Sequence, residues 1–222
     1  MKKIVYFLTL LIAVGLYSCD DHIELVDLSL KIGNIYRMDG TIVPVDYHLT
    51  QGEEAPEAIG VVTGVGAEED SFSALVVALV DLPGNYYFSN DTIETNASSD
   101  LEAFNGKENT AALLAEYAEN ENLDPMGAVM ATAYSAGGVA GWHLPSVAEM
   151  YSVVKNRGIV IDAIKKVGGE DFKDEWYLTS TVDGTSDKTS LFYNYCIIMP
   201  EGRRISDFRN SSHKVRPFFV LK

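Results

Sequence analysis

The sequence has 222 residues and a formal net charge of −15, with 32 acidic and 17 basic side chains. Nucleic acid and anionic lipid are poor partners for a chain this acidic, because like charges repel. A chain of this length buries roughly 70% of its unfolded surface, so it needs neither a disulfide nor a metal ion to hold a core.

The N-terminus has the pattern of an export signal. Lys2 and Lys3 precede an apolar run, Ile4 to Tyr17, and Ser18 is the small residue expected before a cleavage site. The run has 14 residues, whereas a transmembrane helix needs about 20. We therefore predict a signal peptide over residues 1–18.

Cys19 lies at the predicted cleavage point. The stretch Leu16-Tyr17-Ser18-Cys19 resembles a lipobox, in which the cysteine is diacylated and becomes the new N-terminus; an ordinary secretory signal is the alternative. The acids Asp20-Asp21 resemble the signal that sends some lipoproteins of gut-type Gram-negative anaerobes to the outer face. The resemblance implies a lipidated acidic tether over 19–30 and an outer membrane lipoprotein at the cell surface, held to the membrane by its lipid.

Charge is distributed unevenly along the mature chain. Removal of residues 1–18, which hold two lysines and no acid, takes the net charge from −15 to −17. Residues 19–110 hold 18 acids and three bases, whereas 111–222 hold 14 acids and 12 bases. Any patch that binds anions is therefore expected in the second half.

The first part of the mature chain is predicted to form strands. Asp39-Gly40 is a turn dipeptide between apolar segments, which predicts a hairpin within 32–45. The β-branched and apolar runs 59–65 and 74–82 are predicted to be core strands. A Pro-Gly pair ends the second run, and residues 89–105 have the composition of a polar loop.

From Asn109 the apolar spacing becomes that of helices. Asn109 is the expected N-cap of a first helix. Asp124 is the expected N-cap of a second helix, and the glycine pair 137–138 is expected to end it. The S-x-x-E capping box 146–149 predicts the start of a third helix, with Gly158 at its end.

A fourth helix is expected around Ile161 to Val167, with Gly168-Gly169 as its stop. The spacing then returns to period two, which is typical of strands with one buried face. The predicted strands are 177–182, 191–199, 203–208 and 214–221.

The second half carries four ordered segments that resemble a known bacterial pattern. A two-helix region is followed by Gly141-Trp142-His143-Leu144-Pro145-Ser146-Val147-Ala148-Glu149-Met150, by Thr179-Ser180-Thr181 and by Val215-Arg216-Pro217-Phe218. The pattern is similar to the C-type-lectin-like domains at the end of the Legionella collagen-like adhesin and in the Fibrobacter succinogenes major paralogous family. The resemblance spans 109–221.

This resemblance implies an α+β fold, C-type-lectin-like, with twisted antiparallel sheets and helices packed on one side. It implies a single domain over 31–222, of which 109–221 carries the motifs. Leu178 stands where the family usually has tryptophan, and the calcium motifs of animal C-type lectins are absent from the sequence. Calcium-dependent sugar binding is therefore not implied.

Most of the motif residues are expected to build the fold. Trp142 precedes a capped helix and is predicted to be a core residue, because a large ring in this place usually packs against a sheet. Arg216 is flanked by apolar strand residues, and we expect it to pair with a carboxylate such as that of Glu149.

The sequence offers no catalytic or metal-binding set, so we expect a protein that is not an enzyme and holds no metal or cofactor. Asp183, Ser186 and Asp187 could supply oxygens to calcium, but a solvated hairpin loop is the preferred interpretation. Cys196, in a predicted strand, is expected to be an inert small hydrophobe. No zinc spacing links His22, His48, His143 and His213.

Exposed aromatic rings and a late basic cluster are the remaining candidates for a site. Rings supply stacking area and arginines hold carboxylate or sulfate groups, so the mixture suits an acidic glycan. Core packing of the rings, and balance of the first half's acids by the arginines, are the alternatives. The candidate binding residues are Trp176, Tyr193, Tyr195, Arg203, Arg204 and Arg209.

The sequence thus predicts a surface-anchored, non-enzymatic recognition domain that binds a glycan or a surface protein and acts in adhesion or carbohydrate binding. No nucleic acid partner is expected. The alternative is a structural or accessory subunit of an envelope assembly, such as a fimbria or a nutrient-uptake complex.

Lipidation at Cys19 can be tested by removing the thiol. In the Cys19→Ala variant no acyl chain can be attached, so the protein should move from the membrane fraction to the soluble envelope fraction. Fractionation followed by immunoblotting measures this. A variant that stays with the membranes would contradict the predicted anchor.

Overall fold

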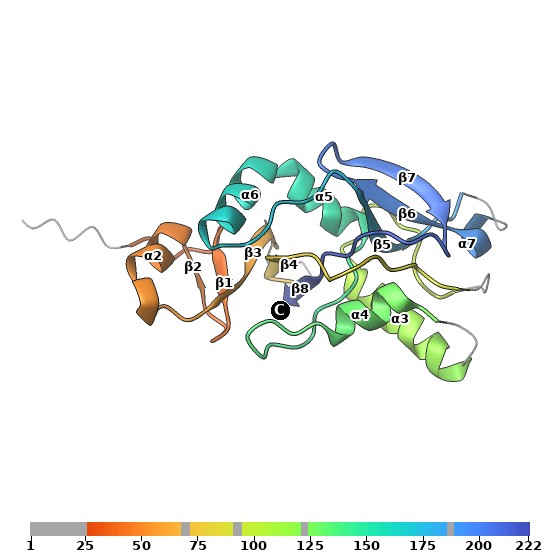
Figure 1. Cartoon of the computed structure of the whole chain (residues 1–222), viewed down its shortest axis with the longest axis horizontal. Coiled ribbons are helices and arrows are strands. Elements are labelled where there is room, and N and C mark those ends of the chain that lie inside the picture. The colour runs from red at the N-terminus through yellow and green to blue at the C-terminus, as the bar shows by residue number, and fades with distance from the viewer. Residues whose placement is uncertain (1–25, 68–71, 91–94, 121–123, 186–188) are drawn as a thin grey trace, which may run out of the picture.

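The computed structural model describes residues 26–67, 72–90, 95–120, 124–185 and 189–222. The predicted signal peptide, Cys19 and the acids that follow it lie outside the described residues. So do Ser186 and Asp187 of the alternative calcium loop. The described part is a mixture of helices and antiparallel sheets, which confirms the α+β class (Figure 1).

The larger sheet has five antiparallel strands in the order β2-β1-β3-β4-β8. The Asp39-Gly40 hairpin and the two core strands of the first half are confirmed, because β1 pairs with β2 and β3 pairs with β4, although β4 ends at Ala78 rather than at residue 82. The strands are β1 (Ile35–Arg37), β2 (Ile42–Val43), β3 (Ala58–Val65), β4 (Ala74–Ala78) and β8 (Phe218–Leu221).

The smaller sheet has three antiparallel strands in the order β5-β6-β7. They are β5 (Trp176–Val182), β6 (Tyr193–Ile198) and β7 (Arg203–Phe208), and a short helix α7 (Thr189–Phe192) precedes β6. The last strand begins at residue 218 rather than at 214, because Lys214 forms a parallel bridge with Tyr177 at the edge of the smaller sheet. The C-terminal segment therefore contacts both sheets.

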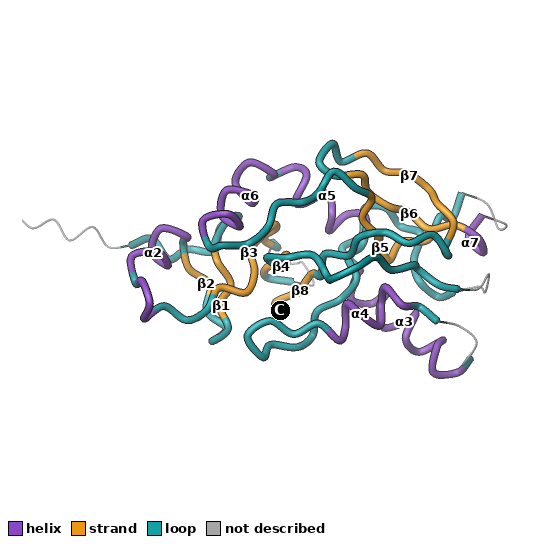
Figure 2. The backbone as a smooth tube through the Cα atoms, in the orientation of Figure 1, coloured by secondary structure: helices purple, strands orange, loops and turns teal. Residues whose placement is uncertain are grey.

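The helices are distributed along the chain between these strands (Figure 2). They are α2 (Val45–Thr50), the 3-10 turn η1 (Gly52–Glu54), α3 (Gly106–Glu119), α4 (Met126–Ala133), α5 (Val147–Lys155) and α6 (Arg157–Lys166). The fourth predicted helix corresponds to α6, which ends before Gly168 as expected, since that glycine has a φ of +80° that other residues rarely adopt.

Two predicted caps are wrong because the side chains have partners elsewhere. Helix α3 begins at Gly106, so Asn109 lies within its first turn and accepts a hydrogen bond from the Ser98 amide at 2.9 Å. Asp124 accepts a hydrogen bond from the Tyr87 hydroxyl at 2.6 Å, and Pro125 is the N-cap residue of α4.

Two predicted helix ends are also wrong. Helix α4 stops at Ala133, before the glycine pair 137–138. Helix α5 stops at Lys155, and Gly158 lies inside α6. The C-cap residue of α5 is Asn156 instead, whose side-chain amide donates to the carbonyls of Ser152 at 3.0 Å and Thr63 at 3.2 Å.

Helix α5 starts at the predicted capping box. The Ser146 hydroxyl accepts a hydrogen bond from the Glu149 amide at 3.3 Å, and the Glu149 carboxylate accepts one from the Ser146 amide at 3.0 Å. The same carboxylate accepts the amide of Gly106 at 3.1 Å and contacts Nε2 of His143 at 3.1 Å. A Cβ at Gly106 would lie 2.2 Å from the carboxylate oxygen, so glycine is required for this approach.

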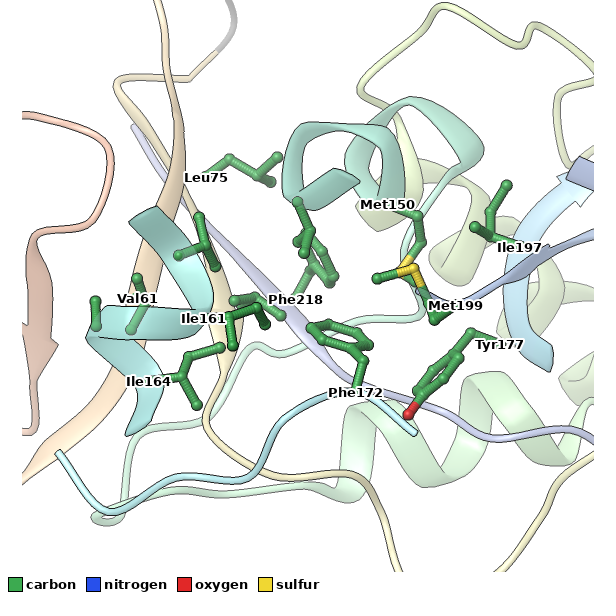
Figure 3. Close-up of a cluster of buried hydrophobic side chains, with 14 of the residues drawn as sticks. Val61, Leu75, Met150, Ile161, Ile164, Phe172, Tyr177, Ile197, Met199 and Phe218 are labelled. Atoms are coloured by element: carbon green, nitrogen blue, oxygen red, sulfur yellow. The ribbon is translucent and has the colours of Figure 1, made fainter. Parts of the chain in front are cut away.

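The main core lies between the larger sheet and helices α5 and α6, and it continues onto one face of the smaller sheet (Figure 3). Val61 and Leu75 come from the larger sheet, Met150 and Ile164 from the helices, and Ile197 from the smaller sheet. A second core packs α3 and α4 against the other face of the smaller sheet, through residues such as Leu113, Ala128, Leu178 and Cys196.

The prediction that helices pack on one side is therefore wrong for the smaller sheet, which has α5 on one face and α3 and α4 on the other. It holds for the larger sheet, because there the face opposite α5 and α6 is covered by the loop that carries Tyr134 and Trp142. Trp142 is 1% exposed, which confirms its predicted place in the core.

Arg216 is fully buried, but its predicted partner is wrong. The Nε of Arg216 donates to the Asp81 carboxylate at 2.5 Å, and Glu149 contacts His143 instead. The guanidinium also donates to the carbonyls of Glu170 and Asp171, at 2.9 and 3.2 Å. It is thus held by the segments that follow β4 and α6.

Within the described residues, no helix is long and apolar enough to span a bilayer.

The two tryptophans of the chain give a matched test of the core. Trp142→Ala should lower the free energy of unfolding by about 3 to 5 kcal/mol, because it leaves a large cavity between the larger sheet and its covering loop. Trp176 is 40% exposed, so Trp176→Ala should cost about 1 kcal/mol or less. Urea denaturation measures both. Equal losses would show that Trp142 is not a core residue.

Candidate functional site

The register of the smaller sheet decides which candidate residues share a face. Directly opposed residues of antiparallel strands point to the same face, and successive residues point to opposite faces. Arg203 is opposite Ile198, which is opposite Trp176, whereas Arg204 is opposite Ile197. Arg203 and Arg204 therefore lie on opposite faces, and the six predicted residues do not form one site.

The face on which α5 packs also carries three rings and an arginine toward β7, which we call the Arg204 strip and define as Tyr193, Tyr195, Arg204 and Phe208. The guanidinium carbon of Arg204 lies 5.1 Å from the centre of the Tyr195 ring, within the range of a cation–π contact. The rings of Tyr193 and Phe208 are 4.7 Å apart across the β6–β7 pair. Three of the six predicted residues are thus brought together here.

Asp183 forms hydrogen bonds with residues on the same face of the sheet as the strip. Its carboxylate accepts hydrogen bonds from the Tyr195 hydroxyl at 2.9 Å, from Ser206 at 2.5 Å and from the Thr185 amide at 3.1 Å. Burial alone would raise the pKa of Asp183, but these hydrogen bonds outweigh it and hold the pKa below its usual range. Asp183 therefore fixes the Tyr195 ring in place.

The opposite face carries Trp176 and Arg203. The Trp176 ring stacks on His213 with ring centres 5.3 Å apart, and Nε2 of His213 lies 2.8 Å from the Asp207 carboxylate. Burial lowers the pKa of His213, although the nearby Asp207 opposes this effect. Ile198, between Trp176 and Arg203, is buried, so an apolar residue separates the ring from the positive charge.

Two of the predicted residues are poorly placed for a ligand. Arg209 is 2% exposed; its guanidinium lies 5.0 Å from the centre of the Phe88 ring, and its carbonyl accepts the Ser89 amide. Burial lowers the pKa of Arg209 to about 10, with Glu116 opposing the shift. Tyr195 is 7% exposed, so its ring serves mainly as a support for Arg204.

Phe208 is a candidate that the sequence reasoning missed. Its ring is 51% exposed and completes the strip beside Tyr193. The signal was present in the sequence, because alternation along β7 puts Arg204, Ser206 and Phe208 on one face.

Other candidate chemistry is enclosed in the fold. Cys196 is buried in the core between the smaller sheet and α3 and α4, where burial raises the pKa of its thiol far above the usual range. Among the described residues, no group of three or more His, Cys, Asp or Glu side chains is placed to hold a metal ion. Two cavities, of about 370 and 550 Å³, are lined by none of the six predicted binding residues.

Comparison of the chain with models of protein families, with curated proteins and with solved structures finds no match.

Proposed function

We propose that the protein is a surface-anchored, non-enzymatic recognition domain of the C-type-lectin-like kind, and that the Arg204 strip binds an acidic glycan. The observation that carries the proposal is the strip itself, where an exposed arginine, the exposed ring of Phe208 and the half-buried ring of Tyr193 lie on one face of a sheet. Because Cys196 is buried, the thiol is not offered as a nucleophile.

The C-type-lectin-like part of the proposal rests on the motif residues. Trp142 packs against a face of the larger sheet, the box of Ser146 and Glu149 starts α5, and Arg216 is a buried residue of the C-terminal segment. Each of these residues stabilises the fold. Motif residues with structural roles are expected where a resemblance in sequence reflects a shared fold. The family assignment itself stays a proposal.

The place of the strip also supports a role in recognition. The first described residues lie near α2, at one end of the elongated molecule, and the β5-β6-β7 sheet lies toward the other end (Figure 1). If Cys19 carries the lipid, the membrane is on the α2 side. The strip then lies at the end of the molecule far from the membrane, where a ligand outside the cell can reach it.

The chemistry of the strip suits a sugar that carries carboxylate or sulfate groups. Tyr193 and Phe208 supply apolar ring surface at small entropic cost, and sugars can stack on such surfaces. The Arg204 fork can donate two hydrogen bonds to one anionic group. The net charge of the chain is strongly negative and repels an anionic ligand. The attraction must therefore come from the local charge of Arg204.

An envelope subunit is the second candidate, and one observation favours it. Strand β7 is at the edge of its sheet, where it pairs only with β6 among the described strands. An open edge can accept a strand from another chain. A structural subunit should co-purify with a membrane partner and show no selective binding on a glycan array.

The two neighbouring arginines give the sharpest test of the strip. Arg204→Gln should weaken binding to sulfated or uronic-acid oligosaccharides by about 1.5 to 3 kcal/mol, roughly tenfold to a hundredfold, because one charge-assisted contact is lost. Arg203→Gln removes the same charge from the opposite face and should change affinity little. Titration calorimetry of the non-lipidated mature chain at low and physiological salt measures both variants.

Lys107→Gln is a matched control, since Lys107 is an exposed cation on α3, away from the strip. Binding to the strip should also fall as salt rises, because exposed charges are screened beyond about 8 Å at physiological ionic strength. Equal losses in all three variants would indicate a general charge effect. No glycan binding by the parent chain would favour the envelope subunit.

A further inference from the structure

A cavity of about 370 Å³ opens in the half of the molecule that contains α2 and α6. Its walls are the connection from α2 to β3, the residues after β4, the loop after α4 and the C-terminal end of α6. We call it the Glu57 cavity. Its volume falls within the range of small-molecule sites, about 300 to 1,000 Å³.

Three polar side chains in the wall have groups available to a ligand. They are the carboxylate of Glu57, Nε2 of His48 and the hydroxyl of Tyr134. Among the described residues, none donates to the Glu57 carboxylate or forms a hydrogen bond with the other two groups. A cavity with a few convergent polar groups of this kind is the usual form of a ligand site.

A hydrogen bond from Arg37 fixes the orientation of the His48 ring. Nε of Arg37 donates to Nδ1 of His48 at 3.2 Å, and the Arg37 guanidinium is itself held by a hydrogen bond to Gln51. Because Nδ1 is the acceptor, the neutral ring carries its hydrogen on Nε2. Burial, and then the charge of Arg37, lower the pKa of His48, so the ring is a neutral donor at pH 7.

Tyr134 is also held in place. Its ring meets the buried ring of Trp142 edge to face, with centres 5.2 Å apart. Burial raises the pKa of Tyr134, an effect that Arg216 opposes and Glu57 reinforces, so the hydroxyl keeps its proton. The Tyr134 hydroxyl can therefore both donate to a ligand and accept from it.

Glu57 is the group that attracts a cation to the cavity, and it acts against the charges of Arg37 beside His48 and of Arg216 near Tyr134. Glu57 is the charged residue in the lining, and no lysine or arginine is among the lining residues. The C-terminal end of α6 also lines the cavity, and the carbonyls of its last turn accept the backbone amides of Val167, Gly168 and Gly169. The lysines of that last turn form ion pairs instead: Lys165 with Asp171 at 2.7 Å and Lys166 with Asp162 at 3.1 Å.

We propose that the Glu57 cavity binds a small molecule that carries a protonated amino group next to hydroxyl groups, the chemistry of an amino sugar. The Glu57 carboxylate accepts a hydrogen bond from the ammonium group. His48 donates a hydrogen bond to a hydroxyl of the ligand, and the Tyr134 hydroxyl donates to or accepts from another. The site lies on different elements from the Arg204 strip and does not depend on the function proposed for that strip.

Calorimetry on the full chain in detergent tests the site with glucosamine, galactosamine, glucose and glucuronate as probes. At least one of the two amino sugars should bind, glucose should bind at least tenfold more weakly, and glucuronate should not bind. Glu57→Gln should weaken amino-sugar binding at least tenfold. Tyr134→Phe, which removes only the hydroxyl, should weaken it about fivefold, as expected for one neutral hydrogen bond.

Glu54→Gln is the matched control, because Glu54 is an exposed acid on η1 that is not among the lining residues. It should leave amino-sugar affinity unchanged. Thermal unfolding checks that each variant is folded. The proposal is overturned if neither amino sugar binds, if glucose binds as tightly, or if Glu57→Gln and Glu54→Gln have the same effect.

Discussion

The buried pair of Arg216 and Asp81 is the contact on which the relation between the two sheets depends. Asp81 follows β4 of the larger sheet, and its second oxygen accepts the hydroxyl of Tyr177 from β5 of the smaller sheet at 2.9 Å. Arg216 also lies 4.2 Å from the centre of the Phe172 ring. A buried charge left without its partner costs about 3 to 5 kcal/mol, so these segments must stay together for the chain to fold.

Glu149 has a similar role at the helices. Its carboxylate joins the start of α5 to the start of α3 through the Gly106 amide and holds His143, which is itself hydrogen-bonded to the backbone of Phe218. The smaller sheet, with a helix layer on each face, is thereby fixed between these contacts. The Arg204 strip is built on strands of that sheet, which is the kind of rigid support that lets a few side chains hold a ligand in one geometry.

Local patterns predicted the elements, whereas partners distant in sequence could not be read from them. The capping box at Ser146 and the Asp39-Gly40 hairpin involve near neighbours, and both are confirmed. The partner of Arg216 is 135 positions away, and no spacing rule points to Asp81. Arg203 and Arg204 are neighbours in sequence, but alternation along β7 puts them on opposite faces of the sheet. The burial of Arg209 and the Glu57 cavity arise from several segments meeting, which a pattern along one segment does not encode.

We propose that an acidic glycan is recognised by the face of the smaller sheet that carries Arg204. Amide ¹H–¹⁵N spectra of the non-lipidated mature chain, recorded while a sulfated oligosaccharide is added, test this most directly. The account predicts that the largest shift changes fall on β6 and β7 around Tyr193, Arg204 and Phe208, with little change around Trp142. Shift changes that are absent, or that gather on another surface of the molecule, would contradict it.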